Sequence, residues 1–155
     1  MGLEIERKFL VINDGWRPFV ESESRLKQGY LTAQPALSIR VRIAGEQAWL
    51  TIKGGMQGIS RSEYEYSIPL QDAREMLDHL VTDAVIDKTR YKVRCGDHLW
   101  DLDLFHGDNS GLAVAEIELQ SESESFQMPD WAGQEVSRDA RYLNANLIRH
   151  PYRDW

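Results

Sequence analysis

The sequence predicts an α+β protein: an eight-stranded antiparallel β-barrel that forms a tunnel with a charged interior, with helices packed on the outside. Three observations support this fold. Eight segments alternate apolar and polar residues, which is the period of a strand with one buried face. In seven of these segments one face carries charged side chains. The charges come as same-sign pairs, such as Glu4/Glu6 and Arg40/Arg42.

The length and composition of the chain limit the class of protein. A chain of 155 residues fits one domain, spanning residues 1–155. The net charge of −7 argues against a general nucleic-acid-binding protein. The single cysteine, Cys95, excludes an internal disulfide and fits a reducing cytosol, so we expect a cytoplasmic protein. We find no apolar run of membrane-spanning length and no signal peptide, and we expect no membrane partner.

The first half of the chain contains five predicted strands. The first covers residues 4–11, and a short helix or loop follows around residues 16–25. The second strand covers residues 27–31, where a bulge at Gly29 would let Lys27 and Tyr30 face the same side. The other three strands cover residues 37–43, 49–53 and 61–68.

The second half of the chain alternates helices and strands. Apolar residues recur at helical spacing between residues 70 and 80, which predicts a helix with one buried face. Residues 86–93 and 99–105 form a hairpin around Gly96-Asp97, and the last strand covers residues 113–120. A terminal helix is expected over residues 139–149, where Pro151 stops it.

The charged faces have two interpretations. An antiparallel sheet with one wet face also alternates, so the charges could simply face water. A solvated face usually mixes charged and uncharged polar residues, however, and gains nothing from same-sign pairs. If the faces instead converge, sixteen ionised groups line one cavity: Glu4, Glu6, Glu63, Glu65, Asp101, Asp103, Glu116, Glu118, Lys8, Arg40, Arg42, Lys53, Arg61, Lys88, Arg90 and Lys92. Such a cavity must be wet and must hold ions, because an unpaired buried ion costs several kcal/mol. The apolar faces then point outward, under helices expected around residues 16–25, 70–80 and 139–149.

The first strand shows which ions this cavity would hold. Glu4, Glu6 and Lys8 share one face of the strand. The two carboxylates, roughly 7 Å apart, repel each other unless a cation lies between them. A divalent cation would remove this repulsion, and the ammonium of Lys8 would suit an anion held by that cation.

The charged pairs occur in a characteristic order along the chain. They are Glu4-x-Glu6-x-Lys8, Arg40-x-Arg42, Thr51-x-Lys53, Glu63-x-Glu65, Lys88-x-Arg90 and Glu116-x-Glu118. This set, together with Gln28-Gly29-Tyr30, resembles the CYTH, or triphosphate tunnel metalloenzyme, superfamily and its short bacterial members. The resemblance covers essentially the whole chain. It implies a tunnel of eight antiparallel strands that hydrolyses or cyclises triphosphates with a divalent metal.

The resemblance also implies roles for the paired charges. Arginine and lysine side chains would clamp the phosphate oxygens, since the planar guanidinium binds phosphate bidentately. These residues are Arg40, Arg42, Lys53, Lys88 and Arg90. Carboxylates would hold one or two Mg²⁺ or Mn²⁺ ions, which prefer oxygen ligands. The proposed ligands are Glu4, Glu6, Glu116 and Glu118, with Glu63 and Asp103 nearby.

Lys8 and Tyr30 are the candidate catalytic pair. A nearby ammonium lowers the pKa of a phenol, so the pair could activate an attacking water. Lys8 could equally serve as one more phosphate ligand, and the residues alone do not decide between these roles.

We expect a metal-dependent triphosphatase that acts on inorganic tripolyphosphate, a small polyanionic substrate. A class IV-type adenylate cyclase or a thiamine triphosphatase is the enzymatic alternative, and either needs a pocket for an organic group. A non-catalytic polyphosphate- or nucleotide-binding module is the alternative of another class, against which the intact acidic pairs argue. The sequence does not decide whether the protein is a monomer or a homodimer.

Overall fold

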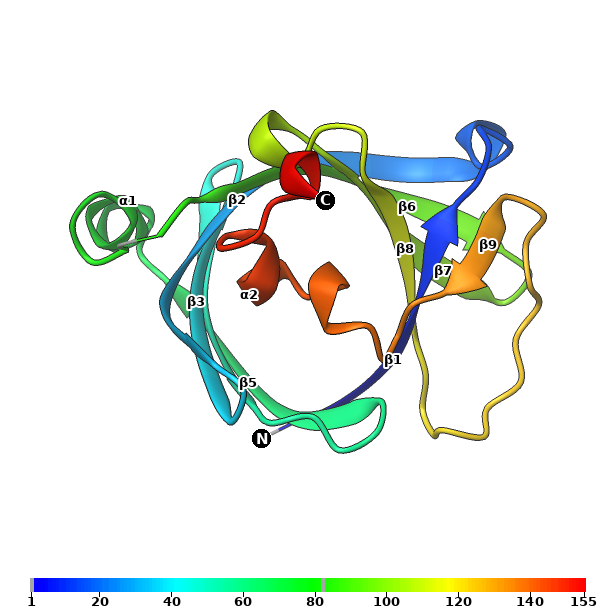
Figure 1. Cartoon of the computed structure of the whole chain (residues 1–155), viewed down its shortest axis with the longest axis horizontal. Helices are drawn as coiled ribbons and strands as arrows, with labels where there is room; N and C mark the ends of the chain where they lie inside the picture. The colour runs from blue at the N-terminus through cyan, green and yellow to red at the C-terminus, as the bar shows by residue number, and fades with distance from the viewer. Residues whose placement is uncertain (1, 82) are drawn as a thin grey trace.

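The computed structural model describes residues 2–81 and 83–155 of the chain. Eight strands close into an antiparallel barrel in the order β1-β5-β4-β3-β2-β6-β7-β8, with β8 pairing back to β1, and Figure 1 views this barrel end-on. This confirms the predicted barrel. The strands are β1 (Gly2–Val11), β2 (Val20–Gln34), β3 (Leu37–Ala44), β4 (Gln47–Gly54), β5 (Ser60–Ile68), β6 (Ile86–Cys95), β7 (His98–Phe105) and β8 (Ala113–Glu118).

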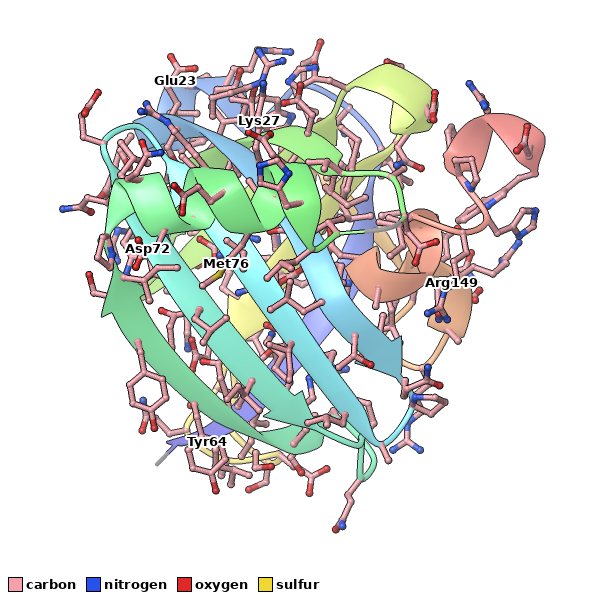
Figure 2. All side chains as sticks on the ribbon, turned by 90° about the vertical axis from the view of Figure 1, so that its left-hand side faces the viewer. Glu23, Lys27, Tyr64, Asp72, Met76 and Arg149 are labelled. Atoms are coloured by element: carbon pink, nitrogen blue, oxygen red, sulfur yellow. The ribbon has the colours of Figure 1, made fainter. Side chains whose placement is uncertain are left out.

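The outer face of the barrel is apolar and is covered in two places. The predicted helix near residues 70–80 is confirmed as α1 (Leu70–His79), whose Ala73 and Met76 pack with Val41 and Ala48 of the sheet (Figure 2). On the side of β1, β7 and β8, Trp131 and other residues around the barrel form a second cluster. No helix in residues 2–81 and 83–155 is long and apolar enough to span a membrane.

A ninth strand lies outside the barrel, where we expected only a connection. β9 (Ala132–Glu135) pairs with the end of β1, opposite Phe9 and Val11. Its position also brings Glu135 to Arg7 of β1, whose Nε donates to Glu135 Oε2 at 2.9 Å. A strand of four residues with one apolar side chain has too few alternations to be visible in the sequence.

The expected helix over residues 139–149 is wrong in both form and place. The structure has two short pieces there, a 3₁₀ turn η3 (Ala140–Tyr142) and α2 (Asn144–Leu147), separated by Leu143 in an extended conformation. Figure 1 shows this segment inside the ring of strands and not on its outside. Tyr142, Leu147 and Ile148 pack there against the inner apolar ends of the strands, in a cluster that includes Phe105. The remaining 3₁₀ turns are η1 (Arg17–Phe19), η2 (Gly107–Asn109) and η4 (Tyr152–Asp154).

The helix or loop expected around residues 16–25 is confirmed only at its start. Only η1 is helical, and β2 begins directly after it at Val20. The first half of β2 pairs with β6 alone, and residues 21–25 are exposed. Because no side chain of residues 21–25 is buried, apolar alternation is absent and the backbone pairing leaves no signal in the sequence.

The predicted bulge at Gly29 is wrong as well. β2 is regular from residue 26 to 30, so Gln28 and Tyr30 share the inner face, while Lys27 is exposed on the outside (Figure 2). The irregularity in pairing with β3 lies between Tyr30 and Thr32. Gly29 instead allows close packing beside α1: a Cβ there would lie 2.8 Å from Val81 Cγ2.

We therefore predict that Gly29→Ala destabilises the protein. The added methyl would also lie 2.9 Å from Leu77 Cδ2, and overpacking of this kind costs about 1–3 kcal/mol, more than alanine gains over glycine in a strand. Urea unfolding should show a lower midpoint with an unchanged slope. Ser24→Ala, at an exposed position of the same strand, is the control and should leave the midpoint unchanged. A Gly29→Ala midpoint at or above that of the wild type would contradict this account.

Candidate functional site

A cavity of about 680 Å³ runs into the barrel. All of the sixteen charged residues that we expected to face inward line this cavity, except Lys88, Lys92 and Asp103. Among the described residues the lining holds eight acidic and eight basic side chains, so their formal charges sum to zero. The acids are Glu4, Glu6, Glu63, Glu65, Asp101, Glu116, Glu118 and Asp139, and the bases are Lys8, Arg40, Arg42, Lys53, Arg61, Arg90, Arg138 and Arg149.

One wall of the cavity, on β1 and its neighbours β5 and β8, is mainly acidic. Lys53 Nζ bridges two carboxylates of this wall, at 2.8 Å from Glu4 Oε2 and 3.3 Å from Glu63 Oε2. A hydrogen bond with Glu4, followed by burial, raises the pKa of Glu63 to about 7. Burial alone would raise the pKa of Glu4, but Glu63 and Lys53 hold that pKa well below its usual range. The two carboxylates can therefore share a proton near neutral pH.

The adjacent carboxylates of β1 and β8 repel one another. Glu6 lies opposite Glu118 in the β1–β8 register, and neither forms an ion pair with any residue in 2–81 or 83–155. Burial and the charges of Glu116 and Glu4 raise the pKa of Glu6 well above its usual value. Burial, followed by the charges of Glu4 and Asp101, also raises the pKa of Glu118. The charges of Lys53 and Lys8 offset only part of this effect at Glu6.

The opposite wall, on β3 and β6, is mainly basic. Arg40 is buried and its Nη2 donates to Thr51 Oγ1 at 3.3 Å, while Arg42 Nε donates to Gln28 Oε1 at 2.8 Å. Burial, followed by the charges of Arg40 and Arg90, lowers the pKa of Arg42 to about 9. The guanidinium groups of Arg40, Arg42 and Arg90 therefore lie close together on one side of the cavity.

Lys88 and Asp103 lie behind this basic wall and are fully buried. Lys88 Nζ lies 2.7 Å from Asp103 Oδ2, and Arg90 binds the same carboxylate through Nε and Nη2 at 2.8 and 2.9 Å. Burial opposes ionisation of Asp103, but Arg90 and Lys88 hold its pKa well below the usual range. The same burial lowers the pKa of Lys88 to about 7.

Lys8 and Tyr30 line the cavity from different strands, β1 and β2. Lys8 Nζ donates to the backbone carbonyl oxygen of Tyr142 at 2.9 Å and lies 3.5 Å from Glu116 Oε1. Tyr30 is buried beside the same C-terminal segment, in a cluster that includes Tyr142. The ammonium is thus held by groups other than Tyr30 and is fixed in direction.

Residues 2–152, nearly the whole chain, match the CYTH domain. The chain belongs to the CYTH family. It is 44% identical over 155 residues to an inorganic triphosphatase of Acetivibrio thermocellus, which covers 100% of this chain and 99% of the relative. It is 38% identical over 151 residues to an inorganic triphosphatase of Nitrosomonas europaea, covering 93% and 95% of the two chains.

The fold of this CYTH domain is similar to solved structures. A crystal structure of an inorganic triphosphatase superposes with a TM-score of 0.65 at 36% identity, covering 94% of this chain and 97% of the other. The barrel described above is therefore the architecture of the family, and the relatives extend over the same length as this chain.

The acidic wall of the CYTH domain offers carboxylate oxygens, which are the ligands that a hard divalent cation prefers. No group of three or more Asp, Glu, His or Cys side chains within residues 2–81 and 83–155 is already arranged around one metal position. Lysine ammonium groups lie among the carboxylates at present, as Lys53 and Lys8 show. Mg²⁺ needs only one or two protein carboxylates, because waters and substrate phosphates complete its coordination. Glu6 and Glu118, which lie opposite each other in the β1–β8 register and both have a raised pKa, fit that requirement.

The sequence interpretation missed the C-terminal part of the site. Ser137, Arg138, Asn144 and Arg149 line the cavity, although none belongs to a charged row of a strand. Asn144 also contacts the basic wall, since its Oδ1 accepts from Lys88 Nζ at 3.2 Å. The placement of the terminal segment inside the barrel shows that these residues line the cavity.

Proposed function

We propose that this CYTH protein is a divalent-metal-dependent hydrolase of inorganic tripolyphosphate. The observation that carries the proposal is the division of the cavity into an acidic wall and a basic wall. A triphosphate on the basic wall leaves its negative charge facing the carboxylates, so the arrangement is stable only with cations in between. The full-length likeness to two inorganic triphosphatases supports the same substrate.

The phosphate-binding residues in this proposal come from β3, β4 and β6. Arg40, Arg42 and Arg90 offer guanidinium groups that suit bidentate contacts with phosphate oxygens. Lys53 can leave its two carboxylates for the substrate when a cation takes its place. Lys88 adds its charge from behind the wall, where it faces Asp103.

The metal-binding residues in this proposal are Glu4, Glu6, Glu63, Glu116 and Glu118, which line the cavity. The ion is Mg²⁺ or Mn²⁺, both of which prefer oxygen ligands. When bound, such an ion neutralises negative charge on the phosphates during transfer. The carboxylates orient the ion, and the guanidinium groups orient the triphosphate for attack by water.

The lining favours an inorganic substrate over a nucleotide. Among the described residues Tyr30 is the only aromatic side chain that lines the cavity, and it is buried beside the C-terminal segment. Phe105, which belongs to an inward row, packs against the C-terminal segment and offers no stacking surface. A base would therefore gain little binding energy in the tunnel.

The test is phosphate release from tripolyphosphate, ATP, thiamine triphosphate and pyrophosphate with Mg²⁺ or Mn²⁺. We expect kcat/KM for tripolyphosphate to exceed that for ATP by about tenfold or more, which corresponds to about 1.4 kcal/mol of transition-state binding. A preference for ATP with cyclic AMP as product would assign the protein to the cyclases. Tight binding without turnover of any compound would assign it to the binding modules.

Removal of the metal should stop the reaction. Exhaustive chelation is expected to lower tripolyphosphate hydrolysis to the buffer rate, and added Mg²⁺ or Mn²⁺ should restore it. Circular dichroism should stay unchanged throughout, because the ion pairs of Lys53 and Lys8 hold the acidic wall without metal. Undiminished hydrolysis after chelation would reject the metal assignment. We also propose that the protein is cytoplasmic, because its single cysteine fits a reducing compartment. Cell fractionation tests this location.

A further inference from the structure

Asp103 is fully buried and forms ion pairs with two cations, Arg90 and Lys88. Arg90 lies directly opposite it in the β6–β7 register, and their contact is bidentate. Lys88 Nζ approaches Oδ2 at 2.7 Å from the next inward position of β6. Three N–H donors therefore occupy the two oxygens of a side chain that is fully buried.

This arrangement leaves no oxygen of Asp103 facing the cavity. Asp103 and Lys88 are absent from the cavity lining, whereas Arg90 is part of it. A carboxylate that binds a metal must present an oxygen to the ion, and Mg²⁺ also keeps several waters. Asp103 could do so only after releasing the buried Lys88 and the largely buried Arg90, each of which would then lose a counter-charge.

The bidentate contact also fixes the direction of Arg90. Its Nε and Nη2 edge is held by Asp103, and its Nη1 lies 3.4 Å from Asp101 Oδ2. A guanidinium held along one edge presents its remaining N–H groups in a fixed direction, which is how planar recognition of phosphate gains its geometry. Asn144 of the C-terminal segment completes the arrangement by accepting from Lys88 Nζ at 3.2 Å.

We propose that Asp103 is a positioning residue, which orients Arg90 toward the triphosphate, and that it does not bind the metal. This assignment rests on the proposed function and replaces the metal role that the sequence suggested for Asp103. It differs from the roles of the acidic wall because Asp103 acts only through the cation beside it.

The first test compares metal binding with catalysis in Asp103→Asn. Direct titration with Mn²⁺, without substrate, should give an affinity within about twofold of the wild type, while kcat/KM for tripolyphosphate falls about 10- to 100-fold, as for other outer-shell partners. Glu118→Gln is the matched comparison, since it should lose Mn²⁺ affinity. A loss of Mn²⁺ affinity of tenfold or more in Asp103→Asn would overturn the proposal. The Mn²⁺ titration needs no turnover, so its result stands apart from the identity of the substrate.

The second test asks whether Asp103 acts through Arg90. In an Arg90→Gln background, Asp103→Asn should lower kcat/KM by less than about threefold, because residues acting as one unit are not additive. An equal loss in both backgrounds would overturn the proposal. Asp101→Asn removes a charge two residues away and is the control. It should lower kcat/KM less than Asp103→Asn does, because Asp101 holds Arg90 only through Nη1.

Asp103→Asn can also fail to fold, since it leaves the buried Lys88 and the largely buried Arg90 without their carboxylate. Asp103→Asn combined with Lys88→Met removes one of those cations and keeps the test possible. This double variant should fold, bind Mn²⁺ as the wild type does, and hydrolyse tripolyphosphate more slowly than Lys88→Met alone. Equal rates in the double variant and in Lys88→Met would count against a positioning role.

Discussion

Glu118→Gln is expected to abolish tripolyphosphate hydrolysis while leaving the barrel at least as stable as the wild type. Glu118 faces Glu6 across the β1–β8 pair, and burial, followed by the charges of Glu4 and Asp101, disfavours its ionised form. A neutral amide relieves that repulsion but is a poor ligand for a hard cation. We expect kcat to fall by more than about 100-fold, beyond the usual cost of losing an outer-shell partner. Phosphate release at saturating Mg²⁺ or Mn²⁺ and calorimetric melting measure the two effects.

Glu116→Gln should also lose turnover but, unlike Glu118→Gln, should lower the melting temperature. Burial opposes its ionisation, yet Lys8 and Arg90 lower the pKa of Glu116 to about 2. A folded-state pKa below the unfolded value stabilises the fold above the unfolded pKa, so the stabilisation exists at neutral pH and disappears as the pH falls toward 2. The amide removes it at pH 7. Glu23→Gln, on the exposed outer face (Figure 2), is the control for both variants. Full activity in either Glu116→Gln or Glu118→Gln would reject the metal assignment.

The sequence predicted those strands whose two faces differ. β3 and β8 alternate apolar residues with charged ones, so both their extent and their inward faces were visible. The first half of β2 is exposed, so nothing marks it as a strand except pairing with β6, a distant segment. The break at Leu143 and the entry of the C-terminal segment into the barrel are tertiary effects of the same kind. Local patterns do not record contacts between segments that are far apart in the chain.

The site shows the same division between local and distant information. The order of the charged pairs placed most of them correctly around one cavity, because a strand fixes which side chains share a face. It could not show which charges would pair with one another. Asp103 and Glu116 both belong to acidic pairs of the same spacing, yet one lies behind the cavity wall and the other lines the cavity. That difference depends on the neighbouring strand and not on the motif.

Lys8→Met is expected to lower kcat for tripolyphosphate by about 10²- to 10⁴-fold if Lys8 and Tyr30 activate the attacking water, the range of general acid–base catalysis. An ammonium has three N–H donors. One contacts the carbonyl oxygen of Tyr142 and another can face Glu116, so one direction remains for water or phosphate. A simple phosphate ligand would instead show its loss mainly as a raised KM.

The decisive comparison separates rate from binding at both positions. Tyr30→Phe should lower kcat much more than it raises KM, since an interaction made only in the transition state appears in kcat. Lys8→Arg keeps the charge but not the compact ammonium, so it should preserve KM better than kcat. Lys27→Arg and Tyr64→Phe make the same chemical changes at positions on the outer face (Figure 2) and should leave both constants unchanged. If Tyr30→Phe retains the wild-type kcat and Lys8→Met changes only KM, Lys8 is a phosphate ligand and the pair does not activate water.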